Sequence, residues 1–353
     1  MSEDSVLGAY VNARVRGMKS ELLPRRRMEE FLDFDDVSRL IDGLVNSPYG
    51  EDMSEALGRF KGADAVEEAV SRNLVKTLQK LNRLLRDEWG ELISTFLHRW
   101  DLLAVKSLLR LRHTGIDERE GELALCPGPT LTLALMHSFA QRGSMEELVG
   151  ALVAWNPDIC GGLNTGLAEY QSTGHIRVLE DALDRAYYSG KYKTLSSSED
   201  ENTQMVRKML GMEIDRINIR MMLHLNGSGG SPEDRLARLL PGGTLRQQVL
   251  RDMAFAKTAE GVVEQLGSTI YADLVQRLFV FIQTGRFSPM ERFFEILMIN
   301  ELKRDTRIHV FSLAVLMQFV WLKNNEVVNL RMIARGESQH LPKARVREEV
   351  QYA

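Results

Sequence analysis

Apolar residues recur along the chain with the spacing of an α-helix. One stripe advances by three or four residues at each step and comprises Val66, Val70, Leu74, Leu78, Leu81 and Leu85. A second stripe comprises Leu92, Phe96, Trp100, Leu103 and Leu108. Such steps place apolar side chains on one face of a helix. Strand-length alternating runs bounded by turn signals do not recur, so helix packed on helix is the architecture that the pattern predicts.

Proline, glycine and polar clusters divide these helical stretches. The clearest turns are predicted at Leu23-Pro24, residues 126–129, residues 227–232 and residues 240–243. Residues 196–201 are predicted to form a polar loop in which a serine caps the following helix. The adjacent carboxylates Asp35 and Asp36 precede an apolar run, which favours a helix-capping turn over an acid–base pair.

A search for internal repeats finds one segment three times. These anchor segments are residues 100–110, 213–222 and 324–333, with a shorter copy at residues 10–15. When Lys106, Asn218 and Asn329 are superposed, the copies lie 112 and 111 residues apart. One copy therefore has a lysine where the others have asparagine, so the asparagine is not an obligatory ligand in every copy.

Two further markers keep the same order. Glu67, Glu180 and Glu291, the marker glutamates, lie 39, 38 and 38 residues before those three positions. Similar apolar segments, 40–44, 148–152 and 262–266, complete the pattern. It predicts three similar helical domains of about 110 residues, with boundaries at 1–118, 119–230 and 231–353. Residues 4–22 would form an orphan anchor helix that packs with the last copy.

At this point the residues resemble a known family. Residues 10–23, Asp101 with residues 106–110, and residues 326–336 are similar to segments of the C subunit of bacterial and archaeal V/A-type rotary ATPases, called d in eukaryotes. The resemblance implies a funnel of three similar helical domains with pseudo-threefold symmetry. It also implies a non-catalytic central-rotor subunit that couples a central shaft to a membrane ion-translocating ring, in ATP-driven ion transport or ATP synthesis.

The same resemblance implies partners and a location. The partners would be the D- and F-type shaft subunits and the proteolipid of the membrane rotor ring. The protein would lie at the cytoplasmic face of the membrane as a peripheral part of the complex. Whether the transported ion is a proton or sodium stays open.

The repeated polar residues are candidate structural or interface anchors: Asn12, Arg14, Asp101, Lys106, Glu213, Asn218, Arg220, Glu326, Asn329 and Arg331. They could contact a partner, or they could connect helices within each copy. Repetition favours the second interpretation, because a single shaft is not threefold symmetric. A separate basic run, Arg25, Arg26 and Arg27, is either a solvated turn or a docking site for an acidic patch or lipid headgroups.

Composition and the absence of known motifs exclude several classes of function. The net charge of −4 disfavours a general nucleic-acid binder. The most apolar stretch, residues 310–322, is too short to span a bilayer. No Walker A motif, paired metal-ligand spacing or cofactor motif occurs, so neither catalysis nor a cofactor is expected. Cys126 and Cys160 are interpreted as reduced, buried thiols, and a face with Met205, Met209 and Met212 as core.

Two rival functions remain. An all-helical enzyme would need a clustered metal or phosphate site, and no such cluster stands out. A general all-helical repeat scaffold or adaptor is the main alternative, but the period of about 110 residues is far above that of the short helical repeats.

Overall fold

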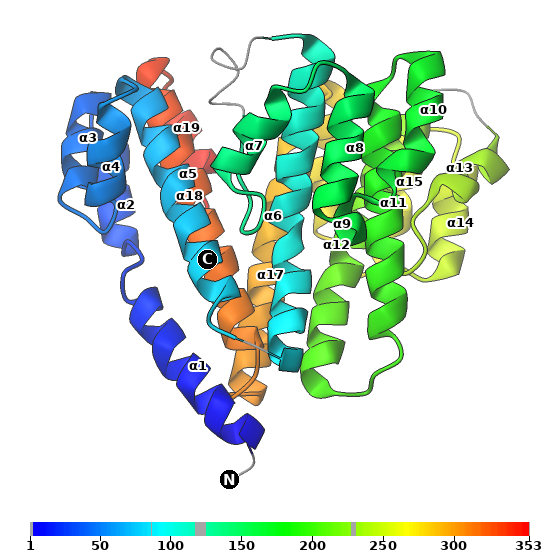
Figure 1. The fold of residues 1–353 in the computed structure, drawn as a ribbon, viewed down its shortest axis with the longest axis horizontal. Coiled ribbons are helices and arrows are strands. Elements are labelled where there is room, and N and C mark those ends of the chain that lie inside the picture. Colours follow the sequence, from blue (N-terminus) through cyan, green and yellow to red (C-terminus); the bar gives the residue numbers. More distant parts are fainter. Residues whose placement is uncertain (1–2, 86, 117–124, 227–230, 353) are drawn as a thin grey trace. The chain divides into compact units, whose positions relative to one another are not determined.

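The computed structural model describes residues 3–85, 87–116, 125–226 and 231–352. Over these ranges the regular elements are α-helices and one 3₁₀ turn, with no strand (Figure 1). The predicted all-α class is therefore confirmed. The chain divides into two compact units. One consists of Met1–Leu183 and Leu302–Ala353, and the other of Asp184–Glu301. The division into three copies and the funnel stay predictions.

Helices of the first unit come from both ends of the sequence. They are α1 (Glu3–Lys19), α2 (Arg25–Leu32), α3 (Val37–Val45), α4 (Gly50–Leu57), α5 (Gly62–Asn82), α6 (Asp87–Thr114), α7 (Leu133–Ala140), α8 (Met145–Trp155), α9 (Pro157–Cys160), α10 (Leu163–Thr173), α18 (Ala314–Ser338) and α19 (Lys343–Glu349). The second unit holds α12 (Glu201–Asn226), α13 (Pro232–Arg238), α14 (Gln247–Phe255), α15 (Ala259–Glu264), the 3₁₀ turn η2 (Gln265–Ser268) and α16 (Leu274–Thr284). Helices α11 (Ile176–Leu195) and α17 (Ser288–Ile308) run through the division between the units.

The predicted apolar stripes mostly form the core of the first unit. Within α5, Val66, Val70, Leu74, Leu78 and Leu81 are all buried. Helix α18 packs along α5, and Figure 1 shows the two side by side. The stripe of α6 is wrong at Leu103, which is 44% exposed. The buried face of α6 there runs through Asp101, Leu102, Ala104 and Val105 instead.

Helix α1 packs against α18, the contact that the predicted orphan helix requires. Its buried stripe consists of Val11, Val15 and Met18. The Asn12 side chain donates to the carbonyl of Val310, and Lys19 Nζ donates to Gln318 Oε1 over 3.2 Å. Residues about 300 positions apart in the sequence are thus neighbours in this unit.

The core of the second unit gathers around Tyr271 and Phe294, whose ring centroids lie 5.1 Å apart. Met205, Met209 and Met212 on α12 are buried, so their prediction as core is confirmed. Helix α12 is capped by Asp200, which accepts from the amide of Thr203, and not by the predicted serine. Asp36 caps α3 as predicted, by accepting from the amide of Ser38. Residues 227–230 of the predicted glycine-rich turn lie outside the described residues.

Candidate functional site

Asp215 of the second anchor segment is completely buried and holds a turn of the second unit. Its carboxylate accepts from the amides of Thr244 at 2.8 Å and Leu245 at 3.2 Å, and from the Tyr271 hydroxyl at 2.7 Å. Gly243, with φ near +94°, brings the turn so close that a Cβ there would collide with the carboxylate. Burial raises the pKa of Asp215, and the hydrogen bonds from Thr244, Tyr271 and Leu245 oppose that shift.

Asp101 makes the same contact in the first unit. It is also fully buried, and it accepts from the amides of Thr130 at 2.9 Å and Leu131 at 2.8 Å. A Cβ at Gly128 would lie 2.8 Å from the Asp101 Cα. Burial raises the pKa of this carboxyl, while the two amide donors lower it. Each aspartate precedes its amide donors by 29 and 30 residues, so the two are equivalent.

Glu326 takes this role in the third anchor segment, with partners from the start of the chain. It accepts from the amide of Leu23 and, at 2.6 Å, from the Tyr49 hydroxyl. Lys323 Nζ lies 3.0 Å from the same carboxylate. Leu23 precedes Tyr49 by 26 residues, which is also the separation of Leu245 and Tyr271. The residues around Pro24 therefore correspond to the turn after Pro241.

We call Asp101, Asp215 and Glu326 the clamp carboxylates. In two of the three anchor segments, an asparagine three residues after the clamp carboxylate holds a second stretch of backbone. The amide side chain of Asn218 donates to the carbonyl of Leu240 at 3.0 Å and accepts from the amide of that residue at 2.8 Å. Asn329 does the same with both backbone groups of Gln351, at 2.8 and 3.2 Å. Each side chain thus replaces a missing backbone partner.

The structural equivalence shifts the first copy by two residues. Asp101, Asp215 and Glu326 are 114 and 111 residues apart, so Ala104 occupies the asparagine position in the first copy. Lys106, which the sequence comparison placed there, is half-buried two residues further along α6. The superposition of Lys106 on the asparagines was therefore wrong. That alignment rested on similarity of residue type. The contact between each carboxylate and its turn instead aligns Asp101 with Asp215 and Glu326.

The marker glutamates pair with arginines of the anchor helices. Arg335 forms a two-pronged contact with Glu67, with one N–O distance of 2.6 Å, and Arg110 forms one with Glu180 at 2.5 and 3.0 Å. In both anchor helices the arginine follows the clamp carboxylate by nine residues. Arg331 donates to Ser71, which lies one turn from Glu67 on α5.

The second unit completes this pattern with different residues. Glu291 is held by Arg216 at 2.6 Å and by Arg220 at 3.6 Å, and Arg216 also contacts Glu213 at 2.9 Å. Burial opposes the charge of Arg216, but Glu291 and Glu213 outweigh it and raise the pKa of the guanidinium. Each marker glutamate therefore pairs with the anchor helix of the copy before it, and the first marker pairs with the third anchor helix.

The candidate residues of α1 and the basic run belong neither to the carboxylate–turn contacts nor to the glutamate–arginine pairs. Arg14 is exposed on α1, whereas Asn12 is buried against the α17–α18 connection. The basic run begins α2 and is engaged within that helix, since Arg25 contacts Glu29 and both Arg26 and Arg27 contact Glu30. These pairs lower the net charge that the run presents to a partner.

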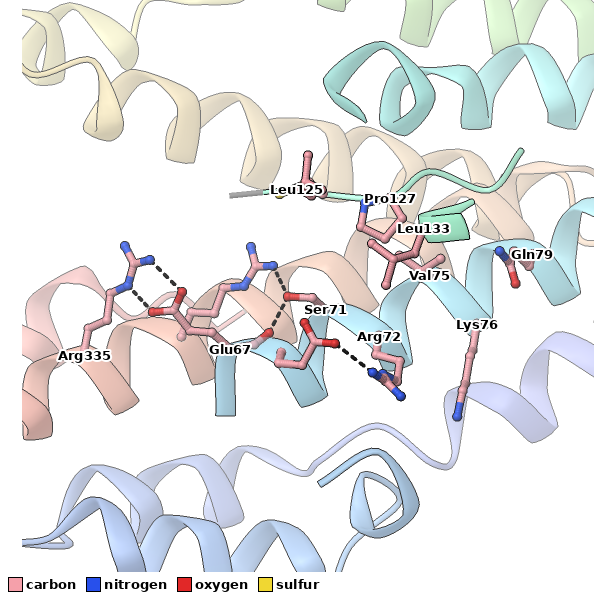
Figure 2. A pocket seen from close by; sticks show the side chains of 13 residues that line it. Glu67, Ser71, Arg72, Val75, Lys76, Gln79, Leu125, Pro127, Leu133 and Arg335 are labelled. Carbon is pink, nitrogen blue, oxygen red and sulfur yellow. Dashed lines mark hydrogen bonds and ion pairs between the residues drawn. The ribbon is translucent and has the colours of Figure 1, made fainter. Parts of the chain in front are cut away.

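A cavity of about 380 Å³ lies beside the third anchor helix (Figure 2). Polar side chains of α5, the segment 125–127, and Arg331 and Arg335 line it. Its charged groups contact one another, as in the pairs Arg335–Glu67 and Arg72–Glu68, the latter at 2.9 Å. Arg335 and Arg72 are thus engaged by carboxylates of the same wall, while Arg331 donates to the Ser71 hydroxyl. These contacts reduce the positive charge that the cavity presents to an anion.

Residues that could bind a metal do not gather in the described part of the chain. No group of three or more His, Cys, Asp or Glu side chains there is placed to hold an ion. Both cysteines are free, but Cys126 is exposed, so its prediction as a buried thiol was wrong. Burial, together with the nearby Asp101, raises the pKa of the Cys160 thiol to about 12. No helix among the described residues is long and apolar enough to cross a membrane.

Comparison with known proteins agrees with this arrangement. The sequence model of the ATP synthase (C/AC39) subunit matches residues 11–349. The chain belongs to the ATP synthase (C/AC39) subunit family. This assignment confirms the resemblance noted from the anchor segments, and the match extends from α1 into α19.

Several relatives within this family are named as the C subunit of A-type ATP synthase. The protein of Methanococcoides burtonii is 27% identical, over 97% of this chain and 93% of its own length. That of Methanothermobacter thermautotrophicus is 28% identical, over 96% of this chain and 86% of its own. That of Pyrococcus furiosus is 22% identical, over 96% and 89%. The similarity therefore covers nearly the whole of each protein.

Sequence reasoning named the clamp carboxylates Asp101 and Glu326 and both asparagines, but in the second anchor segment it named Glu213, which contacts Arg216, in place of Asp215. It also missed the partners of the clamps. Tyr49 and Tyr271 are the clearest omissions, because each lies more than 50 residues from its carboxylate. A usable signal was present in the turns, where Gly128-Pro-Thr-Leu131 matches Gly242-Gly-Thr-Leu245. A glycine followed two residues later by two amide donors is the arrangement that a buried carboxylate needs.

Proposed function

We propose that this member of the family is the central-rotor subunit that connects the shaft of a rotary ATPase to its membrane ring. The family match over residues 11–349 carries the proposal. The relatives named as the A-type ATP synthase C subunit support it, because their similarity extends over nearly the whole chain. The role is mechanical: the protein would keep ion flow and ATP turnover coupled by passing torque between its two partners.

The internal contacts suit a part that must resist shear. In each anchor helix a buried carboxylate holds the backbone of a turn that is distant in sequence. Buried hydrogen bonds of this kind cannot be exchanged for water without cost, so they fix one arrangement of helix and turn. Close-packed helices transmit strain because their cores are dense.

The proposed partners are the D- and F-type shaft subunits and the ring proteolipid. The chain would be a peripheral subunit at the cytoplasmic face and would contribute no active site of its own. The repeated clamp residues would then serve the stiffness of the body, and the contacts with the partners would lie on exposed residues that do not repeat.

Affinity purification from gently solubilised host membranes tests this function. The tagged chain is expected to bring down shaft subunits and the ring proteolipid, identified by mass spectrometry. Membranes that lack the chain should lose ATP-driven ion transport, and reintroducing the chain should restore it. Recovery of the chain alone, or with unrelated soluble proteins, would favour the general helical scaffold.

The basic run allows a sharper second experiment. A double variant, Arg25→Gln with Arg26→Gln, should weaken recovery of the complex if the run docks to a partner. Arg345→Gln is the matched control, because it removes an exposed arginine from α19. Equal recovery of the complex with the wild-type chain, the double variant and Arg345→Gln would assign the run to the solvated surface of α2.

A further inference from the structure

The end of α17 and the connection from it to α18 expose three apolar side chains close together in the sequence. Ile308 is 66% exposed, Val310 43% and Phe311 55%. Single exposed apolar residues are common on soluble proteins, but three within four positions make a patch that normally meets a partner. These residues belong to the first unit.

The backbone of this connection is held in place while its side chains face outward. The carbonyl of Val310 accepts from Asn12, and a Cβ at Gly8 would lie 2.9 Å from the Cβ of Phe311. The amide of His309 donates to the carbonyl of Asp305 at 2.9 Å. A fixed backbone presents the apolar side chains at little further conformational cost on binding.

The corresponding connections of the other two helix pairs lack this feature. Between α11 and α12 the chain reads Ser196-Ser197-Ser198, which is polar. Between α5 and α6, Leu84 is half-buried and Leu85 is buried. The exposed apolar side chains are therefore not a requirement of the repeated fold.

Basic residues precede the third connection at the end of α17. Lys303, Arg304 and Arg307 are exposed at the end of α17, where Asp305 is the one acidic residue between 302 and 311. Lys19 of α1 is close enough that Lys303 contributes, after burial, to lowering the pKa of its ammonium group. The apolar patch is therefore flanked by positive charge.

We propose that the surface formed by residues 303–311 binds anionic lipid headgroups at a membrane surface. Lysine and arginine attract the negative lipid surface, while aliphatic and aromatic side chains enter the boundary between headgroups and acyl chains. A basic protein partner would be repelled by the same charges. The proposal adds a lipid contact to the proposed rotor role and rests on that role only for its place at the membrane.

Vesicle sedimentation with the isolated full-length chain tests this contact. Vesicles of phosphatidylcholine with about one-third phosphatidylglycerol should bind the protein, and pure phosphatidylcholine vesicles should bind it far more weakly. Raising the salt concentration should weaken binding, because screening acts on the charged part of the contact. Absence of binding to the anionic vesicles at low salt would overturn the proposal and leave the surface to a protein partner.

Substitutions separate this surface from general stickiness. Phe311→Ser should weaken vesicle binding by about tenfold, since it removes one partly exposed aromatic side chain from the contact. Phe255→Ser is the matched control, because Phe255 is 52% exposed in the second unit. Equal losses in the two variants, or none in Phe311→Ser, would refute the assignment. Circular dichroism checks that both variants fold.

This result is independent of the complex purification. The isolated chain can fail to bind vesicles and still be recovered with shaft and ring subunits, in which case only the lipid contact is wrong. If it binds vesicles but is never recovered with those subunits, the lipid contact stands and the rotor role fails.

Discussion

The clamp at Asn218 offers a direct test of how the repeated polar residues act. Its side chain is fully buried and satisfies both the carbonyl and the amide of Leu240, through bonds of 3.0 and 2.8 Å. Asn218→Ala removes both bonds and leaves two buried backbone groups without a partner. If the residue instead contacted another subunit, the substitution would hardly change the free energy of unfolding of the isolated chain.

The expected cost follows from the two lost bonds. A buried backbone group left unpaired costs about 1–3 kcal/mol, and the alanine leaves some space that water can enter, so we expect about 3 kcal/mol in total. Asn226 on the same helix is a graded control. Among the described residues its side chain makes one bond, to the carbonyl of Ala256 at 2.9 Å, and it is half-buried. Asn226→Ala should cost about 1 kcal/mol or less.

Two measurements read out this difference. Urea unfolding followed by far-ultraviolet circular dichroism gives the loss of stability of each variant. Hydrogen exchange measured by mass spectrometry on a peptide that contains Leu240 reports the local effect, since its amide loses its acceptor. The reasoning is refuted if Asn218→Ala costs no more than Asn226→Ala, or if exchange at Leu240 does not accelerate.

Three further predictions follow from single contacts. Glu337→Gln should stabilise the protein by about 1 kcal/mol above pH 7 and have no effect near pH 4, because burial raises the pKa of this half-buried carboxyl to about 7; urea unfolding across this pH range measures it. Gly243→Ala should cost about 3 kcal/mol in the same assay, through its positive φ and its collision with the clamp carboxylate, whereas Gly267→Ala, which meets open space, should change stability by less than about 0.5 kcal/mol. A thiol reagent should label Cys126 in the native protein and reach the buried Cys160 only after unfolding.

The sign of the pH effect follows from proton binding. The folded-state pKa of Glu337 lies above its ordinary value of 4.5, so between these two values the folded protein binds more protons than the unfolded chain. The contribution of Glu337 to stability therefore falls as the pH rises from about 4.5 to about 7 and is then constant. Glu349→Gln, an exposed change on α19, is the control. A difference between wild type and Glu337→Gln that does not grow over this window, or a Glu349→Gln curve like that of Glu337→Gln, would contradict the assignment.

The outcomes for the glycines and thiols are equally open to contradiction. Similar stability of the Gly243 and Gly267 variants would mean that the turn can move away from its clamp carboxylate. Rapid native labelling of two thiols would mean that the helices around Cys160 open easily, contrary to its complete burial.

Local pattern was enough to predict that the chain is helical, whereas the division into three copies stays a prediction. The α5 stripe is buried as expected, because one face of a long helix against a partner is a local property of spacing. The stripe failed at Leu103, where α6 buries Asp101 and its neighbours. A helix that buries a polar side chain for a distant turn does not follow hydrophobic spacing alone.

The partners of the clamps could not be predicted in the same way. Leu23 and Gln351 lie near opposite ends of the sequence, yet they hold Glu326 and Asn329 of one helix. Leu240 and Leu245 take the corresponding positions within one short turn of the second unit. The turn that supplies these partners is continuous in the second unit, but in the first unit its two parts come from opposite ends of the sequence. Similarity of residue type does not reveal that these parts are equivalent.

Repetition itself separates structural from functional residues in this chain. A contact that recurs in every copy is expected to stabilise the fold of each copy, for example by holding a turn against a long helix. A partner that lacks the same symmetry can be recognised only by what differs between copies. The clamp carboxylates and marker glutamates belong to the first class, whereas the exposed apolar side chains at 308–311 occur in one copy. We therefore expect the clamp residues to serve the fold, and we expect partner contacts at sites that no repeated motif marks, such as the third helical connection.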